Sequence, residues 1–366
     1  MRPLAAILGF VLILIVLWDA FETVILPRRV TRRLRLTSLF YSSIWVPWSA
    51  LVRLFARGRG REKFLSLFGP LSLLILLGIW VFALILGYAL LFWAANTRLN
   101  SLPESVNFLT YLYLSGTTFF TLGYGDITPM LPLGRTVAVI EAANGFGLLA
   151  IVISYLPILY QAFSRREASI SLLDARAGSP SSAVELLRRH RAEDSFDDLN
   201  RLLSEWERWS AELLESHLSY PVLCYFRSQH DNQSWLGALT TVLDTCALVM
   251  VGVDGGPIWQ ARMTFAMARH AVVDLAQVFR TRPSDAADCA TRLSSAELVR
   301  LRGILKQNGI HMSDNLETEQ RLLELRLMYE PYVAALSEWL MMPLPPWILP
   351  PDAIDNWKTS AWGRIQ

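Results

Sequence analysis

Cysteine, histidine and catalytic motifs are scarce in this sequence. It contains three cysteines and five histidines among 366 residues. The cysteines (Cys224, Cys246 and Cys289) are too few and too scattered for a disulfide framework, and no histidine lies at a metal-ligand spacing from a cysteine or another histidine. There is also no nucleophile elbow and no phosphate-binding loop. The sequence therefore predicts no enzyme, no metal centre and no organic cofactor.

Charged residues, and lysine in particular, are also scarce. Only 18% of the residues are charged and 53% are hydrophobic, which gives a mean hydropathy of +0.33. Such a chain is too apolar to be wholly soluble, although its second half is polar enough to fold in water. The net charge of +2 gives no indication of nucleic-acid binding. Arginine outnumbers lysine by 31 to three, as is typical of GC-rich bacterial genomes.

Three long apolar stretches predict helices that cross a membrane. They are Leu4–Leu26, Leu71–Ala95 and Gly134–Phe163. Each is long enough to span a hydrocarbon core of about 30 Å at about 1.5 Å per residue. The segment Ser105–Phe120 is shorter and contains Ser, Thr and Asn, so we expect it to enter the membrane without crossing it, as a re-entrant helix.

The distribution of basic residues predicts the orientation of these helices. Eleven of the 34 basic residues lie in the first 63 positions, and Arg165 and Arg166 follow the last apolar stretch. Because cytoplasmic loops carry an excess of Lys and Arg, we expect residues 27–63 and the chain after Arg166 to be cytoplasmic. Two acids near the inner end of the first span, Asp19 and Glu22, are expected to pair with basic residues such as Arg28 or Arg29.

The stretch Leu36–Phe55 allows two interpretations, a further span or a helix that lies on the membrane surface. Basic clusters precede and follow it, so a spanning helix would leave one cluster outside. Its apolar residues recur at helical spacing with serines and Arg53 between them, which favours the interfacial helix. These apolar residues are Leu36, Leu39, Phe40, Ile44, Trp48, Leu51, Val52 and Phe55.

Beyond Arg166 the pattern is that of a soluble, mainly helical domain. We expect this domain over residues 167–342 and a proline- and tryptophan-rich tail over 343–366. The stretch Ser234–Val253 is apolar enough to span, but no basic cluster anchors it, so a buried core helix is expected. One amphipathic helix is predicted from an apolar stripe. The stripe consists of Phe196, Leu199, Leu202, Leu203, Trp206, Trp209 and Leu213.

The most informative motif lies between the second and third spans. Residues Thr121–Asp126 read Thr-Leu-Gly-Tyr-Gly-Asp, and Thr117 and Thr118 precede them. Glycines at alternate positions allow backbone angles that a side chain would forbid, so that successive carbonyls can face one axis. The motif resembles the selectivity-filter signature of the potassium-channel family, in which backbone carbonyls and a threonine hydroxyl replace the hydration shell of the ion.

This resemblance implies specific roles for residues in about a quarter of the chain. Carbonyls of the filter segment, Thr121, Leu122, Gly123, Tyr124 and Gly125, would bind K+, with the Thr121 hydroxyl as a further ligand. Leu122 departs from the commonest valine, so we expect altered packing behind the filter. Thr117 stands where some relatives have an acid, which puts inactivation behaviour in doubt. Tyr113 either donates a hydrogen bond to Asp126 or only packs at the interface.

Four residues of the third span are candidates for gating. Gly145 and Gly147 lie where channels of this type often place a hinge, although close helix packing explains such glycines equally well. Pro157 is expected to kink the helix near its cytoplasmic end. Glu141 is an intramembrane acid that either acts in gating or hydrogen-bonds to the re-entrant helix.

Together these patterns predict an all-α membrane protein of the potassium-channel type. The expected divisions are a membrane and interfacial region over residues 1–63, a pore domain over 64–166, the helical domain and the tail. The resemblance implies a multi-pass homotetramer in a bacterial inner membrane that conducts K+ passively and is gated by, or assembled through, its cytoplasmic domain, with an unidentified cytoplasmic effector as a further partner. The alternative is a membrane signalling or scaffold protein with a pore-like fold that does not conduct.

Overall fold

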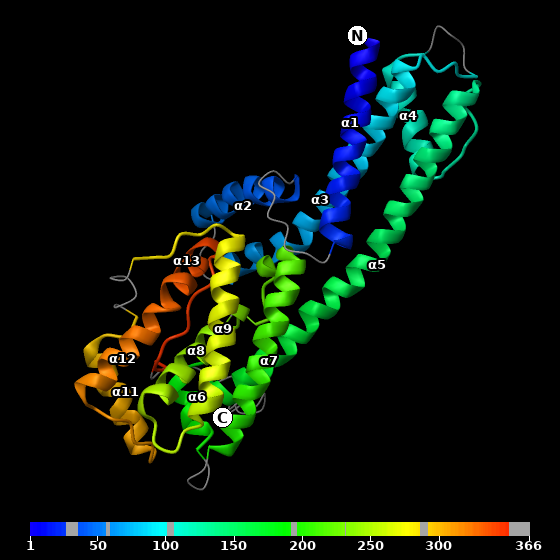
Figure 1. Ribbon diagram of the computed structural model, residues 1–366. Helices are drawn as coiled ribbons and strands as arrows, with labels where there is room; N and C mark the ends of the chain where they lie inside the picture. The colour runs from blue at the N-terminus through cyan, green and yellow to red at the C-terminus, as the bar shows by residue number, and fades with distance from the viewer. Residues whose placement is uncertain are drawn as a thin grey trace, which may run out of the picture. The chain divides into compact units, whose positions relative to one another are not determined.

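A computed structural model describes residues 1–26, 36–55, 59–100, 106–191, 196–230, 232–285 and 292–350 (Figure 1). The regular structure of these residues consists of helices and of two isolated β-bridges, Leu99–Pro129 and Val253–Met312. The predicted all-α class is confirmed. The chain divides into two compact units, Met1–Ala56 with Leu67–Gln161 and Arg57–Ser66 with Ala162–Gln366.

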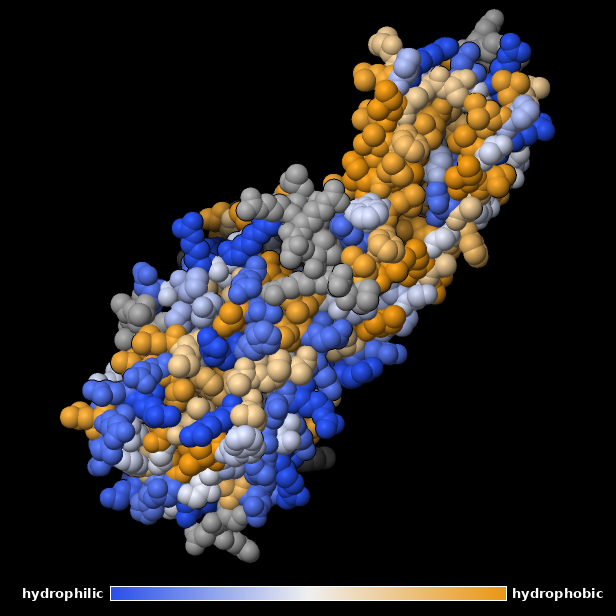
Figure 2. Space-filling view, in the orientation of Figure 1, coloured by the Kyte–Doolittle hydropathy of each residue, from blue (hydrophilic) through white to orange (hydrophobic). Residues whose placement is uncertain are grey.

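The first unit contains all or part of five of the described helices, since the start of α3 and the end of α5 belong to the second unit. They are α1 (Arg2–Ala20), which continues as a π-helical turn η1 (Phe21–Ile25), α2 (Leu36–Phe55), α3 (Arg59–Ala94), α4 (Phe108–Phe119) and α5 (Pro132–Ala177). Three of them, Arg2–Ile25, Gly60–Ala94 and Pro132–Ala177, are long and apolar enough to cross a membrane, whereas α2 is not in that set among the described helices. The visible face of the first unit is largely hydrophobic in Figure 2, as expected for helices that contact lipid.

Two of these helices extend beyond the apolar stretches that predicted them. The helix α3 begins at Arg59 rather than at Leu71, and α5 ends at Ala177 rather than at Phe163. Hydropathy marks only the part of a helix that suits lipid, while the helix itself continues until the backbone is interrupted. For α5 the interruption is Gly178, which has a φ of +84°, as is common just after a helix end.

Close contacts join α1 and α2 to α3. A Cβ added to Gly9 of α1 would lie 2.6 Å from the carbonyl oxygen of Gly87 in α3, so the two backbones meet directly. On α2, Trp45 is buried and its ring centroid lies 4.7 Å from that of Phe68 in α3. The helices α1 and α2 are thus packed against α3, the helix that precedes α4 in the chain.

Asp19 of α1 accepts hydrogen bonds from two other helices of the first unit. Its carboxylate accepts hydrogen bonds from Thr37 Oγ1 at 2.7 Å and from Trp80 Nε1 at 3.1 Å. These contacts join α1, α2 and α3, and the expected pairing with basic residues stays a prediction. Arg28 and Arg29 lie outside the described residues.

The second unit is a helical domain whose core is formed mainly by α7, α8 and α9. Its helices are α6 (Ala183–Arg189), α7 (Asp197–Ser219), α8 (Trp235–Gly252), α9 (Ile258–Val278), α11 (Ser295–Gln307), α12 (Leu316–Leu327) and α13 (Glu330–Leu340), with a short 3-10 helix η3 (Pro221–Tyr225). The apolar stripe predicted on α7 is buried. Although α8 is apolar enough to span, 89% of its apolar window is buried inside the unit, so it is the core helix that the sequence predicted.

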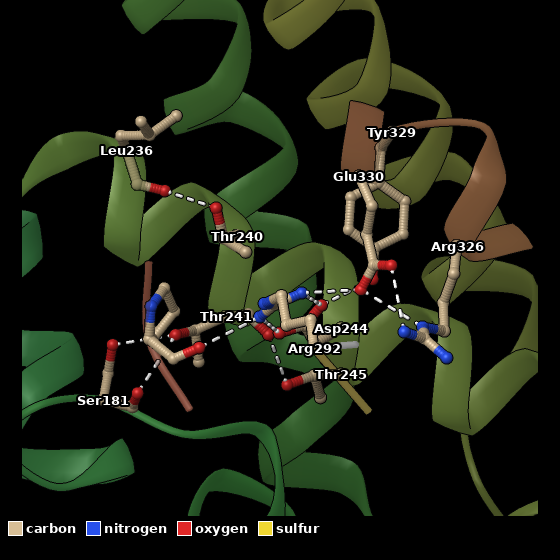
Figure 3. Close-up of polar contacts among 11 residues, drawn as sticks. Ser181, Leu236, Thr240, Thr241, Asp244, Thr245, Arg292, Arg326, Tyr329 and Glu330 are labelled. Carbon is tan, nitrogen blue, oxygen red and sulfur yellow. Dashed lines mark hydrogen bonds and ion pairs between the residues drawn. The ribbon is translucent and has the colours of Figure 1, made fainter. Parts of the chain in front are cut away.

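A buried cluster of charges lies between α8, α12 and α13 (Figure 3). Arg292 forms ion pairs with Asp244 and with Glu330, and Arg326 pairs with Glu330 at 3.1 Å. The Tyr329 hydroxyl donates to Asp244 at 2.5 Å. The two guanidinium groups balance the two carboxylates, and the carboxylates raise the pKa of Arg292 against the effect of its burial. The cluster is therefore a network of ion pairs whose formal charges balance.

Candidate functional site

The filter segment follows directly from the C-terminus of α4. Asn107 caps the other end of this helix, because its side chain accepts from Thr110 N while the Thr110 hydroxyl accepts from Asn107 N. At the C-terminus, Thr121 N donates to Thr118 O at 3.0 Å and Leu122 N donates to Thr117 O at 2.8 Å. The predicted re-entrant helix Ser105–Phe120 is thus observed as Phe108–Phe119, and its last carbonyls anchor the start of the filter segment.

Backbone angles alternate along the filter segment. Thr121, Gly123 and Gly125 have φ values of +54°, +61° and +76°, whereas Leu122 and Tyr124 are not among the positive-φ residues. A left-handed residue at every second position turns successive carbonyls toward the same side, which a regular strand does not do. Thr121 adopts this conformation although it is β-branched, which is a strained choice for such a residue.

The side chains of the filter segment are exposed in the single chain. Leu122 is 53% exposed and Tyr124 is 69% exposed. Large apolar side chains of α5 are exposed as well, including Phe146 at 68% and Ile153 at 62%. The expectation that Leu122 packs behind the filter is therefore not met within one chain and stays a prediction for an assembly. Apolar exposure of this extent indicates surfaces that meet other chains or lipid.

Side-chain and backbone contacts hold the two ends of the segment. The Tyr113 hydroxyl of α4 donates to Asp126 Oδ2 at 2.8 Å, which is the first of the two alternatives considered for this tyrosine. Thr117 uses its hydroxyl within α4, where it donates to Leu114 O at 3.0 Å. After the filter, the bridge between Leu99 and Pro129 ties the loop to the end of α3. The chain is thus held by these contacts before and after Thr121–Gly125.

Glu141 is buried between α4 and α5. It has no exposed surface, and its Oε1 accepts a hydrogen bond from the Ser115 hydroxyl, which also lies 2.8 Å from Ile85 O. The contact corresponds to the second possibility considered for this acid, a hydrogen bond to the re-entrant helix. Ser115 was not predicted as a site residue, although it joins α3, α4 and α5.

A second polar pair connects α3 and α5. Asn144 Nδ2 donates to the hydroxyl of Tyr88. Asn144 follows Glu141 by three positions, so both side chains lie on one face of an otherwise apolar helix. That spacing is the signal by which the sequence could have indicated this pair.

The candidate hinge positions differ from one another. A Cβ at Gly145 would lie 2.0 Å from Phe119 O, so this glycine permits direct contact with the end of α4. At Gly147 an added Cβ would meet no atom within 4 Å among the described residues. Pro157 lies inside α5, which remains one helix through this position. Packing therefore accounts for Gly145, while Gly147 and Pro157 stay candidates for gating.

Arg166, one of the charges used to orient the chain, is buried in the second unit. Its Nη1 donates to Leu223 O at 2.8 Å and lies 3.1 Å from His217 Nε2, and its Nη2 donates to Phe226 O at 2.9 Å. His217 Nδ1 must carry the proton, because it lies 2.9 Å from the carbonyl of Leu213, which can only accept. Burial, together with the charge of Arg166, lowers the pKa of His217 well below its ordinary value. The part of α5 around Arg166 is thus held by a neutral histidine and two carbonyls.

The arrangement around the filter segment suits a dehydrated cation. Backbone carbonyls replace water without bringing a formal charge, and the C-terminus of α4 adds the negative end of a helix dipole at the start of the segment. One chain supplies a single carbonyl-lined segment, and a closed ring of oxygen ligands requires several copies.

Comparison with known proteins agrees with this geometry. Residues 71–162 match the family described as ion channel, which covers α4, the filter segment and most of α3 and α5. The chain is 37% identical over 81 residues to probable potassium channel protein 2 of Methanocaldococcus jannaschii, which is 22% of this chain and 21% of that protein. These matches support an ion-channel function and a membrane-integral protein.

Two further relatives come from bacilli. Protein LctB of Geobacillus stearothermophilus is 41% identical over 61 residues, 17% of this chain and 40% of that protein. The uncharacterized membrane protein YdjJ of Bacillus subtilis is 24% identical over 193 residues, 52% of this chain and 56% of that protein. The chain thus spans less than two thirds of the length of each of these relatives. No solved structure matches the chain.

Proposed function

We propose that this protein is a subunit of a potassium-selective channel. The observation that carries the proposal is the alternation of positive φ at Thr121, Gly123 and Gly125, directly after a capped helix that ends at the segment. Rings of oxygens can replace the hydration shell of K+, and the carbonyls of Thr121, Leu122, Gly123 and Tyr124 with the Thr121 hydroxyl are the ligands that each chain offers.

The channel is a homotetramer in this proposal. One filter segment per chain builds a four-fold ring of carbonyls only when four chains meet on one axis. The exposure of Leu122, Tyr124 and the apolar face of α5 supports an assembly, because these surfaces are uncovered in one chain. Mass measurement of the detergent-solubilised protein is expected to give four copies, whereas a stable monomer or dimer would contradict the proposed pore.

The basic residues that flank the apolar parts of α3 and α5 support a cytoplasmic position for the second unit. We infer that α1, α3 and α5 cross the bacterial inner membrane, that α2 lies at its inner surface, and that the filter opens to the outside. The variants Thr31→Cys and Arg59→Cys should react with a thiol reagent from the inside only, while Met130→Cys, in the exposed loop after the filter, should react from the outside. Reaction of position 31 from the outside would mean that α2 spans.

Passive flux tests the proposal most simply. Liposomes loaded with K+ and containing the purified protein should accumulate labelled rubidium from a K+-free medium, and sodium added outside in excess should not compete. Protein-free liposomes and liposomes with the Gly123→Ala variant serve as controls. Equal flux of sodium, or no flux from a correctly assembled tetramer, would leave the scaffold alternative as the better account.

A further inference from the structure

The Ser115 hydroxyl of α4 faces hydrogen-bonding groups of two other helices. Its Oγ lies 2.8 Å from Ile85 O of α3 and is also hydrogen-bonded to Glu141 Oε1 of α5. A backbone carbonyl can only accept a hydrogen bond, and a serine hydroxyl carries a single proton. Two hydrogen bonds thus meet at Ser115, and its own proton can serve only one of them.

An ionised Glu141 would leave one of these contacts without a proton. Its carboxylate could only accept, so the hydroxyl of Ser115 would have to donate to Oε1. The oxygens of Ser115 and Ile85 would then face each other at 2.8 Å with no proton between them. A protonated Glu141 removes this conflict, because its own hydroxyl can donate to Ser115 Oγ while Ser115 donates to Ile85 O.

The surroundings of Glu141 also favour the neutral acid. The side chain is fully buried within one chain, so it offers no surface to bulk water or to a second copy. Among the described residues no arginine or lysine forms an ion pair with Glu141, and its Oε2 has no hydrogen-bond partner. A buried carboxylate without a counter-charge costs far more free energy than a neutral carboxyl group with one unused carbonyl oxygen.

The contact of Glu141 with Ser115 lies one helical turn from the place where α5 meets the end of α4. Gly145 follows Glu141 by four positions, and a Cβ at Gly145 would lie 2.0 Å from Phe119 O. Phe119 in turn follows Ser115 by four positions. Residues four apart on a helix lie on the same face, so the polar contact and the glycine contact are two successive contacts between the same two helices. The filter segment begins two residues after Phe119.

We propose that Glu141 is protonated and is a positioning residue of the filter segment. Its hydroxyl donates to Ser115, in the direction opposite to the one that an ionised acid would adopt, and Ser115 donates to Ile85 O. This chain of hydrogen bonds joins α5, α4 and α3 and fixes the register in which Gly145 contacts Phe119 O. The protonated contact stands on its own geometry, but its role in conduction rests on the proposed channel function.

Infrared spectroscopy of the full-length protein in detergent tests the proton and needs no ion flux. At neutral pH, the spectrum of the unchanged protein minus that of Glu141→Gln should contain the C=O stretching band of a protonated carboxyl group. The same difference, measured between two proteins that both carry Ser115→Ala, should show this band at a shifted frequency, because the acceptor of its hydrogen bond is gone. A carboxylate band in place of the carboxyl band, or an unshifted carboxyl band, would overturn the proposal.

Rubidium uptake tests the positioning role. Glu141→Gln keeps an N–H donor beside Ser115 and should take up rubidium as the unchanged protein does. Glu141→Met has a similar length but no donor, and it should lower uptake at least about fivefold, as should Ser115→Ala. Ser72→Ala is the matched control, because Ser72 is a buried serine of α3 whose hydroxyl donates to Gly69 O of its own helix at 2.9 Å.

The outcomes separate this proposal from the channel itself. Normal uptake by a tetrameric Glu141→Met variant, or reduced uptake by Glu141→Gln, would overturn the positioning role. A carboxyl band of Glu141 in a protein that takes up no rubidium would reject the channel and keep the protonated contact. Rubidium uptake by the unchanged protein, together with a carboxylate band of Glu141, would keep the channel and reject the proposal.

Discussion

The two units of this protein bury polar groups for different purposes. In the second unit the ion cluster around Arg292 is balanced and lies under α8, α12 and α13 of the same chain. In the first unit the buried contacts of Glu141 and Asp19 only join neighbouring helices, while the filter segment and the face of α5 remain exposed. The charges of this cluster are thus balanced within one chain, whereas the first unit exposes apolar surface that lipid or further copies of the chain would cover.

The largest effect should come from a single added methyl group in the filter segment. Gly123→Ala places a Cβ on a residue with a φ of +61°, although no atom within 4 Å would contact it. Loss of conduction in this variant would therefore report backbone conformation rather than a steric clash within the same chain. Rubidium uptake should fall to the level of protein-free liposomes, while the tetramer and the unfolding midpoint stay close to those of the unchanged protein. Normal uptake would show that this backbone angle is not required.

Substitution of Arg292 should lower the stability of the second unit. Arg292→Met leaves Asp244 and Glu330 buried with one cation fewer, which is expected to cost about 3 to 5 kcal/mol of stability. Arg300→Met, on the exposed face of α11, should change stability by less than about 0.5 kcal/mol. Denaturant unfolding, followed by tryptophan fluorescence, measures both. Equal effects of the two variants would show that the cluster does not stabilise the domain.

Acid should weaken the second unit through His217. The pKa of this residue is well below its ordinary value in the folded protein, so the unfolded chain binds the proton more readily. The resulting stability is present above the unfolded pKa of about 6.5 and is lost as the pH falls below it, by at most about 1.4 kcal/mol per pH unit. His217→Gln should flatten this pH dependence between about pH 6.5 and 5. An unchanged slope would exclude His217 as the responsible group.

The smallest expected effect concerns the connection between α5 and the second unit. Arg166→Lys keeps the charge but loses the donors that reach Leu223 O and Phe226 O, so it should loosen the hold on α5. We expect the open probability to change about fivefold, which corresponds to about 1 kcal/mol. Arg165→Lys, the exposed neighbour, is the control. The potassium-to-sodium permeability ratio should be the same in both variants, and identical gating would reduce Arg166 to a structural role.

Much of the first unit could be predicted from the sequence because its elements are local. The helices that are apolar enough to span and, in the second unit, the core position of α8 depend on composition and spacing within short segments. The contact of Ser115 with Glu141, in contrast, depends on how α4 and α5 are packed, and no local pattern encodes that register. The sequence also did not predict the end of α5, because the apolar stretch ends at Phe163 while the helix continues to Ala177.

Contacts that join distant parts of the sequence were the least predictable. Arg166 was used only as a basic residue that follows a span, and the structure buries it against η3 and His217. Asp244 looked like an isolated acid in an apolar helix, and its partner Arg292 lies 48 positions away. In both places a charged side chain is buried only because several helices contribute acceptors or counter-charges, which a single segment of sequence does not reveal.

The central claim is selectivity for potassium through the segment Thr121–Gly125. Reversal potentials in planar bilayers test it most directly, with K+ on one side and Na+ on the other. We predict a reversal potential close to the equilibrium potential of K+, and the Arg165→Lys variant should give the same value. A reversal potential near zero from a tetrameric protein would contradict the claim, because the carbonyl-lined segment would then conduct both ions equally.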